Sequence, residues 1–81
     1  MNDLQDKDLS PAARLRHFKG GTYRVFGDGF DASHESEPIV IYISEKTLET
    51  WVRKRAEFTE IVDWPDGQRR TRFVLLQTES E

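Results

Sequence analysis

The sequence predicts a small, mainly β domain in which short strands form one curled sheet or barrel. Short apolar runs with strand periodicity alternate with turns rich in glycine and proline, and no helical pattern exceeds two turns. The chain has 81 residues, nine of them aromatic. A chain of this length buries only about 60% of the surface that it exposes when unfolded, so a few large side chains must supply the core.

The N-terminal part predicts a tail followed by one helical turn. Residues 1–9 alternate acids, amides and two leucines without a lasting period, so we expect a disordered acidic tail. Ser10 and Pro11 suit a helix start, because a hydroxyl caps free amides and proline fits the first helical position. A short helical turn is therefore expected over residues 12–15, and the Gly20-Gly21 pair ends this segment.

The middle of the chain predicts two strands. From Thr22 the side chains alternate with a period of two, as in a strand with one buried face. The glycines of Gly27-Asp28-Gly29 interrupt this strand and indicate either a β-bulge or a plain turn. A polar loop over residues 30–37 follows. The run Ile39–Ile43 contains four β-branched residues and predicts a central strand that is buried on both faces.

Trp51–Arg53 predicts a third strand in which Trp51 enters the core. Residues 54–58 are ambiguous between a helix and a turn, with Phe58 as the anchor. Pro65-Asp66-Gly67 indicates a tight reversal, because proline presets φ and glycine accepts a positive φ.

This reversal joins an extended segment over residues 59–64 to a last strand over residues 68–77. Five short strands with one helical turn are most typical of an SH3-like five-stranded β-barrel. We expect one such domain over residues 10–77, between the tail 1–9 and a C-terminal tail over residues 78–81.

Composition excludes several classes of protein. The chain has no cysteine, which excludes a disulfide framework, a thiolate zinc site and a cysteine nucleophile, and it suits the cytoplasm. No apolar run approaches the roughly 20 residues that cross a bilayer, so no membrane association is expected. The net charge is −3, but the segment between the predicted tails carries 11 basic and 10 acidic residues. Net charge therefore does not decide between partners.

Several blocks of the sequence resemble one bacterial family. The blocks are His17 to Val25, His34 with Glu37 to Tyr42, Trp51-Val52-Arg53, Phe58 and Arg72-Phe73. Together they closely resemble the family of domains of unknown function numbered 1653. The resemblance spans most of the chain between the tails and implies a compact β structure, but it implies no activity.

The residues that bear acid–base or metal chemistry do not form a recognised motif. His17 and His34, with four carboxylates in and beside the polar loop, have no metal-ligand spacing, so we expect no metal site and no cofactor. His34, Glu37, Tyr42 and Arg53 are the best set for acid–base catalysis. No nucleophile elbow or phosphate loop accompanies them, and the sequence favours a protein that is not an enzyme.

A binding module is the leading functional interpretation. In small barrels, grooves between loops combine aromatic rings for stacking with basic side chains for phosphate, so nucleic acid or a nucleotide-like anion is the expected ligand. Lys19 and Arg53 would contact the anion, and a tyrosine or tryptophan would stack on a base. The candidate ligand-binding residues are His17, Lys19, Tyr23, His34, Trp51 and Arg53.

Two other interpretations remain open. In the first, Tyr23 and Trp51 are core residues and the arginines form a solvated strand face. An exposed Trp51 would favour the binding interpretation, and a buried Trp51 would favour this packing interpretation. In the second, the domain binds a protein partner or self-associates through an exposed sheet edge, with Ile39–Ile43 or Phe73–Leu76 as the strand.

Overall fold

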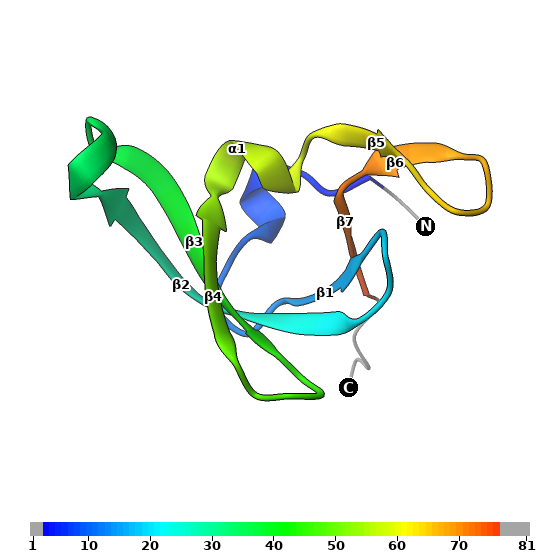
Figure 1. The fold of residues 1–81 in the computed structure, drawn as a ribbon, viewed down its shortest axis with the longest axis horizontal. Helices are drawn as coiled ribbons and strands as arrows, with labels where there is room; N and C mark the ends of the chain where they lie inside the picture. The colour runs from blue at the N-terminus through cyan, green and yellow to red at the C-terminus, as the bar shows by residue number, and fades with distance from the viewer. Residues whose placement is uncertain (1–2, 77–81) are drawn as a thin grey trace.

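The protein folds mainly into β-strands, in a computed structural model that describes residues 3–76 (Figure 1). The elements in chain order are the 3-10 turn η1 (Asp6–Asp8), β1 (Arg14–His17), β2 (Thr22–Asp31), the 3-10 turn η2 (Ala32–His34), β3 (Glu37–Ser44), β4 (Thr50–Lys54), α1 (Arg55–Phe58), β5 (Ile61–Asp63), β6 (Arg69–Thr71) and β7 (Phe73–Leu75). The described part of the chain therefore has more strands than the five that were expected.

Five strands form one antiparallel sheet in the order β4-β3-β2-β1-β7, and β5 and β6 form a separate hairpin. Each strand of the sheet up to β4 pairs with its neighbour along the chain, which short connections favour. Among the described residues no pairing joins β4 to β7, so the sheet does not close into a barrel. The prediction of a mainly β fold is confirmed, whereas its SH3-like barrel is not.

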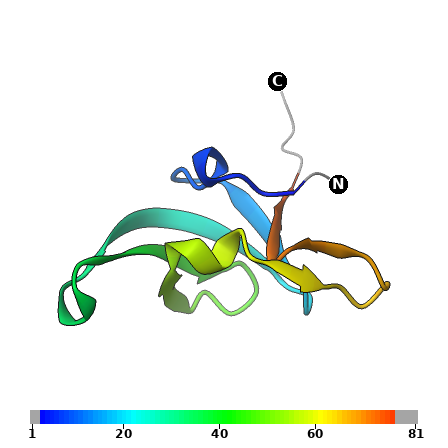
Figure 2. The same ribbon diagram turned by 90° about the horizontal axis from the view of Figure 1, so that it is seen from above.

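The β2–β3 hairpin is the longest feature and extends from the rest of the molecule, with η2 at its tip (Figures 1 and 2). Its register shifts between Val25 and Gly27, which leaves Phe26 as an extra residue on β2. The glycines after Val25 therefore mark a β-bulge, the first of the two expected alternatives. At the tip, Asp31 accepts a hydrogen bond of 2.9 Å from the Ser33 amide and caps η2.

Strand β3 lies inside the sheet as expected, but it is not buried on both faces. Val40, Tyr42 and Ser44 are buried, while the three isoleucines between and before them are only half-buried. One face of β3 packs on the core, and its other face has no layer of the described chain over it. The isoleucine run reflects strand propensity as much as burial.

The core lies on the inner face of the sheet, where α1 covers it. Phe58 of α1 is fully buried, and its ring stacks on Phe73 of β7 with a centroid separation of 4.5 Å. The expectation that Phe58 anchors a tight turn is therefore confirmed. The buried apolar cluster consists of Leu4, Leu9, Leu15, Val25, Val40, Tyr42, Phe58 and Phe73.

The N-terminal segment belongs to this core, and the disordered tail expected over residues 1–9 is wrong for the described residues 3–9. Leu4 and Leu9 are 3% and 4% exposed. Asp3 forms a bridge with Val74 of β7, and the Leu4 amide donates to Thr71 Oγ1 at 2.9 Å. These contacts fix the segment across the sheet, although its sequence has no regular period. The C-terminal tail expected over 78–81 lies outside the described residues.

The helical turn expected after Pro11 does not form; the described N-terminal turn is η1. Ala12 has a φ of 75°, and its amide donates to the Val25 carbonyl at 2.8 Å. Arg14 to His17 then pair with β2 and β7 as strand β1. Ladder pairing outweighs the helical propensity of this stretch because propensity differences are only a few tenths of a kcal/mol per residue.

The last strand predicted over 68–77 is divided at Arg72. The Arg72 amide donates to the Glu60 carbonyl at 2.7 Å, and its own carbonyl accepts from the Phe18 amide at 3.0 Å. This residue therefore connects β6 in the hairpin to β7 in the main sheet. The reversal at Pro65–Gly67 is confirmed, since Gly67 has a φ of 87° and the Trp64 amide donates to the Gln68 carbonyl.

Trp51 is not a core residue. It pairs with the buried Tyr42 and so faces the inner side of the sheet, but 49% of its surface is exposed because β4 is the outermost strand. Of the two positions left open for Trp51, core and surface, the surface is the one it occupies.

Candidate binding site

The hairpin between β1 and β2 presents the first two candidate residues on the inner face of the sheet. His17 ends β1 opposite Phe73, and Tyr23 follows the turn opposite Leu15. Residues directly opposite in a ladder share a face, so both rings point toward the core side. Gly20 and Gly21 make this turn possible, with φ values of 100° and 87° that glycine adopts without a Cβ clash.

Aromatic rings from several strands converge beside His17. Its ring centroid lies 4.8 Å from that of Phe73 and 6.3 Å from that of Tyr23. Tyr23 in turn lies 5.3 Å from Tyr42, edge to face. Such geometry places ring edges against ring faces, which the quadrupoles of the rings favour. His17 is therefore held in a fixed, half-buried position.

Arg53 of β4 completes this wall. Its guanidinium carbon lies 5.8 Å from the centroid of the Phe73 ring. Its Nε donates to the Tyr42 hydroxyl at 3.3 Å, and its Nη1 donates to Glu57 Oε1 at 3.0 Å. These contacts orient the guanidinium over the aromatic rings, with 29% of its side chain still exposed.

Two further cations flank the ring of Phe18, the residue after His17. Lys19 Nζ and the Arg72 guanidinium carbon each lie 5.7 Å from the Phe18 centroid. Arg72 is also fixed by donating from Nε to the Glu57 carbonyl and by pairing with Glu60. Arg72 was not among the candidate residues, although it belongs to the Arg72-Phe73 block that resembles the family.

The electrostatic state of His17 follows from this surrounding. Burial lowers the pKa of His17 most, and the positive charges of Arg53, Arg72 and Lys19 lower it further, to about 4. The imidazole is therefore neutral at pH 7. Its Nδ1 accepts a hydrogen bond of 3.2 Å from the Lys19 amide, which leaves the hydrogen on Nε2 as a donor. Of the three cations beside it, Arg53 and Arg72 pair with Glu57 and Glu60, and Lys19 has no acidic partner among the described residues. A neutral donor beside Lys19 can contact an anionic ligand.

The structure brings most of the candidate residues to one region, which we call the His17 cluster: His17, Lys19, Tyr23, Arg53 and Arg72. Trp51 lies two residues before Arg53 on β4, and so its side chain is on the same face of the sheet. His34 lies elsewhere, in η2 at the tip of the β2–β3 hairpin, where its Nδ1 is 2.8 Å from Asp31 Oδ2.

The basic run on the last strands does not form a free cationic surface. Arg69 pairs with Asp63, and Arg70 pairs with Asp66. Across residues 3–76, eight of the twelve lysines and arginines lie within ion-pair distance of a carboxylate. Within that range the remaining four are Lys7, Arg16, Lys19 and Lys46.

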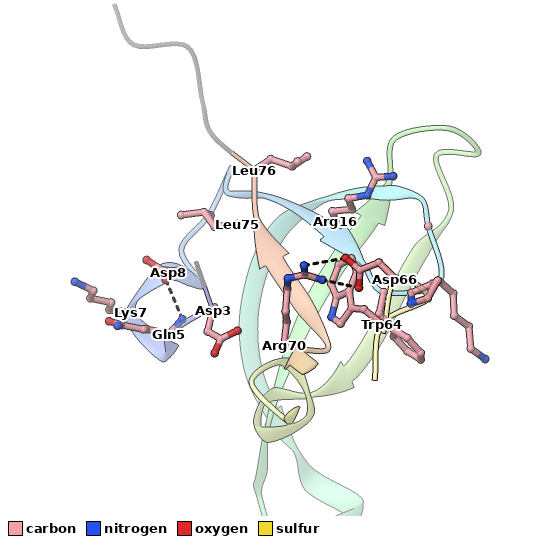
Figure 3. A pocket seen from close by; sticks show the side chains of 14 residues that line it. Asp3, Gln5, Lys7, Asp8, Arg16, Trp64, Asp66, Arg70, Leu75 and Leu76 are labelled. Carbon is pink, nitrogen blue, oxygen red and sulfur yellow. Dashed lines mark hydrogen bonds and ion pairs between the residues drawn. The ribbon is translucent and has the colours of Figure 1, made fainter. Parts of the chain in front are cut away.

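A groove adjoins the His17 cluster on the other side of Phe18. Figure 3 shows it between the N-terminal segment, the β1 strand and the β5–β6 hairpin. Its volume is about 1030 Å³. Arg70 lies over the Trp64 ring at 5.3 Å and joins Asp66. Three of the four cations without a described acidic partner, Lys7, Arg16 and Lys19, line this groove. No local sequence pattern indicates the groove, because its walls are far apart along the chain.

Neither a metal-ligand cluster nor a membrane-spanning helix occurs within residues 3–76. No group of three or more histidines, cysteines or carboxylates within residues 3–76 is placed to hold a metal ion. Among the helices in the same range, none is long and apolar enough to cross a membrane.

The fold and this cluster define a small, mainly β domain with a basic and aromatic surface. The model of the family described as a protein of unknown function, DUF1653, matches residues 13–75, and the chain belongs to this family. The resemblance noted from the sequence is thus confirmed. No curated protein and no solved structure matches the chain.

Proposed function

We propose that this domain is a non-enzymatic binding module whose ligand is a nucleic acid or a nucleotide-like anion. The observation that carries the proposal is that Lys19, Arg53 and Arg72 lie over Phe18 and Phe73, the two rings that contact the neutral, half-buried His17. All three of the charges that shift the His17 pKa are positive. A phosphate placed at this surface would gain from Lys19 and from the Nε2 donor of His17, while Arg53 and Arg72 would share their charge with Glu57 and Glu60.

The surrounding rings supply the second element of nucleotide recognition. Trp51 is half-exposed on the same face, and no ring of residues 3–76 stacks on it. A base that stacks on this indole would lie beside Arg53, with its phosphate directed toward the His17 cluster. Beyond Phe18, Arg16 lines the groove and offers a further contact for a longer strand, although Asp3, Asp8 and Asp66 line the same groove.

A binding role suits His17 better than a catalytic one. A general base at neutral pH works best with a pKa near 7, and an imidazole with a pKa of about 4 is a weak base. The cysteine-free sequence supports the proposed cytoplasmic location.

The test is an amide chemical-shift titration with inorganic phosphate, a mononucleotide, and short single-stranded DNA and RNA, each at low and high salt. We expect shifts at Lys19, Tyr23 and Arg53 that weaken as salt increases, because phosphate contacts release counterions. Phosphate binding should also raise the pKa of His17 above 4, since an anion favours the imidazolium. The ring resonances of His34, at the hairpin tip, are the internal reference and should not respond.

Two lysine variants separate a specific surface from general charge. Lys19→Ala should weaken oligonucleotide binding and lower the salt dependence by about 0.7 in log–log slope, the value for one phosphate contact on a single strand. Lys46→Ala removes a second exposed lysine without a described partner, outside the cluster and the groove, and should leave both unchanged. Equal effects of the two substitutions, or no shifts with any ligand, would refute the proposal.

A further inference from the structure

Strand β4 is an open edge of the main sheet. The sheet ends at β4 on one side and at β7 on the other, and Asp3 already bridges to β7 at Val74. No strand within residues 3–76 pairs with the outer side of β4. Helix α1 follows directly but folds onto the inner face, where Phe58 is buried, and so does not cover this edge.

The hydrogen-bond phase of β4 identifies which backbone groups point outward. The Ser44 amide donates to the Glu49 carbonyl at 2.9 Å, so this pair is hydrogen-bonded. Because such pairs alternate along an antiparallel ladder, the next ones join Trp51 and Arg53 to β3. The amide and carbonyl groups of Thr50, Val52 and Lys54 therefore point away from the sheet.

Two of the five side chains on this edge are large, apolar and exposed to water. Val52 is 60% exposed, on the outer face opposite the half-buried Ile41, and Trp51 is half-exposed on the inner face. Edge strands of monomeric proteins are guarded by inward charges, proline or bulges. On β4 the charge of Arg53 is paired with Glu57, and the charge of Lys54, at the end of the strand, lies 3.7 Å from Glu37.

We propose that β4 pairs in antiparallel fashion with β4 of a second copy of this chain, about a two-fold axis at Val52. This register places Val52 opposite Val52 and Thr50 opposite Lys54, so all three outward-facing residues are hydrogen-bonded. A shift of two residues in either direction leaves at least one of them without a partner. The joined edge turns two five-stranded sheets into one continuous sheet.

The same register makes the side chains complementary, which is why a second copy is the occupant. Trp51 lies directly opposite Arg53 of the second copy on the inner face, and the two-fold axis repeats this cation–π pair. Val52 and Ile41 of both copies form one apolar stripe on the outer face. No two like charges are opposed, whereas a register centred on Lys54 would oppose two lysines.

Sedimentation velocity from micromolar to millimolar concentration tests the association. We expect a concentration-dependent change from one chain to two. Val52→Lys would place two lysines opposite each other at the axis and should give a single chain at every concentration. Phe30→Lys makes the same change at another exposed apolar site, on the β2–β3 hairpin, and should leave the association unchanged.

Disulfide trapping tests the register, since the chain itself has no cysteine. In hydrogen-bonded pairs the Cα atoms are about 5.5 Å apart, within the range that a disulfide spans. A mixture of Thr50→Cys and Lys54→Cys chains should give the mixed dimer far faster than either variant alone gives its own. A single chain at all concentrations, no effect of Val52→Lys, or faster trapping of either variant with itself would each overturn the proposal.

Discussion

The docking of the N-terminal segment can be tested with Leu9→Ala. The Leu9 side chain is 4% exposed and belongs to the buried cluster around Leu15 and Phe73. Truncating a buried leucine costs about 2–5 kcal/mol, the sum of lost transfer free energy and the cavity that remains. Because the segment lies across the sheet and can relax toward it, we expect the lower part of that range, about 2–3 kcal/mol.

Urea denaturation measures this cost directly, and thermal melts provide a second measurement. For a domain of this size 1 kcal/mol shifts the Tm by about 4–8 °C, so Leu9→Ala should lower it by about 8–24 °C. Leu48→Ala is the matched control, because it removes the same atoms from a side chain that is 74% exposed. Equal effects of the two substitutions would refute docking and would support the disordered tail that the sequence predicts.

Three further predictions concern His17, Trp51 and Gly67. The unfolded chain binds a proton on His17 near pH 6.5 and the folded chain only near pH 4. Stability should therefore fall by about 1–2 kcal/mol from pH 7 to 4, after allowance for solvent screening, and His17→Gln should flatten that part of the urea-denaturation pH profile. Trp51→Ala should cost less than about 1 kcal/mol because the ring is half-exposed, whereas Phe58→Ala should cost about 3–5 kcal/mol in the same assay. Gly67→Ala, at a φ of 87°, should cost about 1–2 kcal/mol in a thermal melt, and Gly27→Ala, with ordinary φ and open space, should cost less.

Local chemistry explains which elements the sequence predicted. Pro65–Gly67 specifies a reversal within three residues through its backbone preferences. The glycines after Val25 indicated a bulge or a turn, and the register shift of the ladder shows that the bulge forms. The strand at Ile39–Ile43 follows from β-branched side chains. Its burial does not, because the identity of a residue does not reveal whether a second layer covers the outer face of the sheet.

The elements that were missed depend on contacts between distant parts of the chain. Leu4 lies in a segment without periodicity, which is fixed by contacts with distant residues: the bond from the Leu4 amide to Thr71, the Asp3 bridge to Val74 and the surrounding apolar side chains. Arg72 divides the last strand because its amide and its carbonyl bond to different segments, Glu60 and Phe18. No pattern within a short window of sequence contains this information.

The candidate site was predictable to the extent that it is local. His17, Lys19 and Tyr23 lie on one hairpin, so a single stretch of sequence places them together. Arg53 joins them because the order of the strands brings β4 to this region. The family block Trp51-Val52-Arg53 singled out Arg53, but it did not show where the residue lies in the fold. His34 was grouped with them by residue type alone, and the long β2–β3 hairpin carries it away to its tip.

Trp51 links the two proposals, because one exposed indole cannot serve both at once. In the paired dimer its ring faces Arg53 of the second copy, whereas in the ligand complex it stacks on a base. Dimerisation should therefore weaken ligand binding by the same free energy by which ligand binding weakens dimerisation, since coupling between two binding events is reciprocal. An oligonucleotide that stacks on Trp51 would then dissociate the dimer, and one that binds only through the groove beyond Phe18 would not.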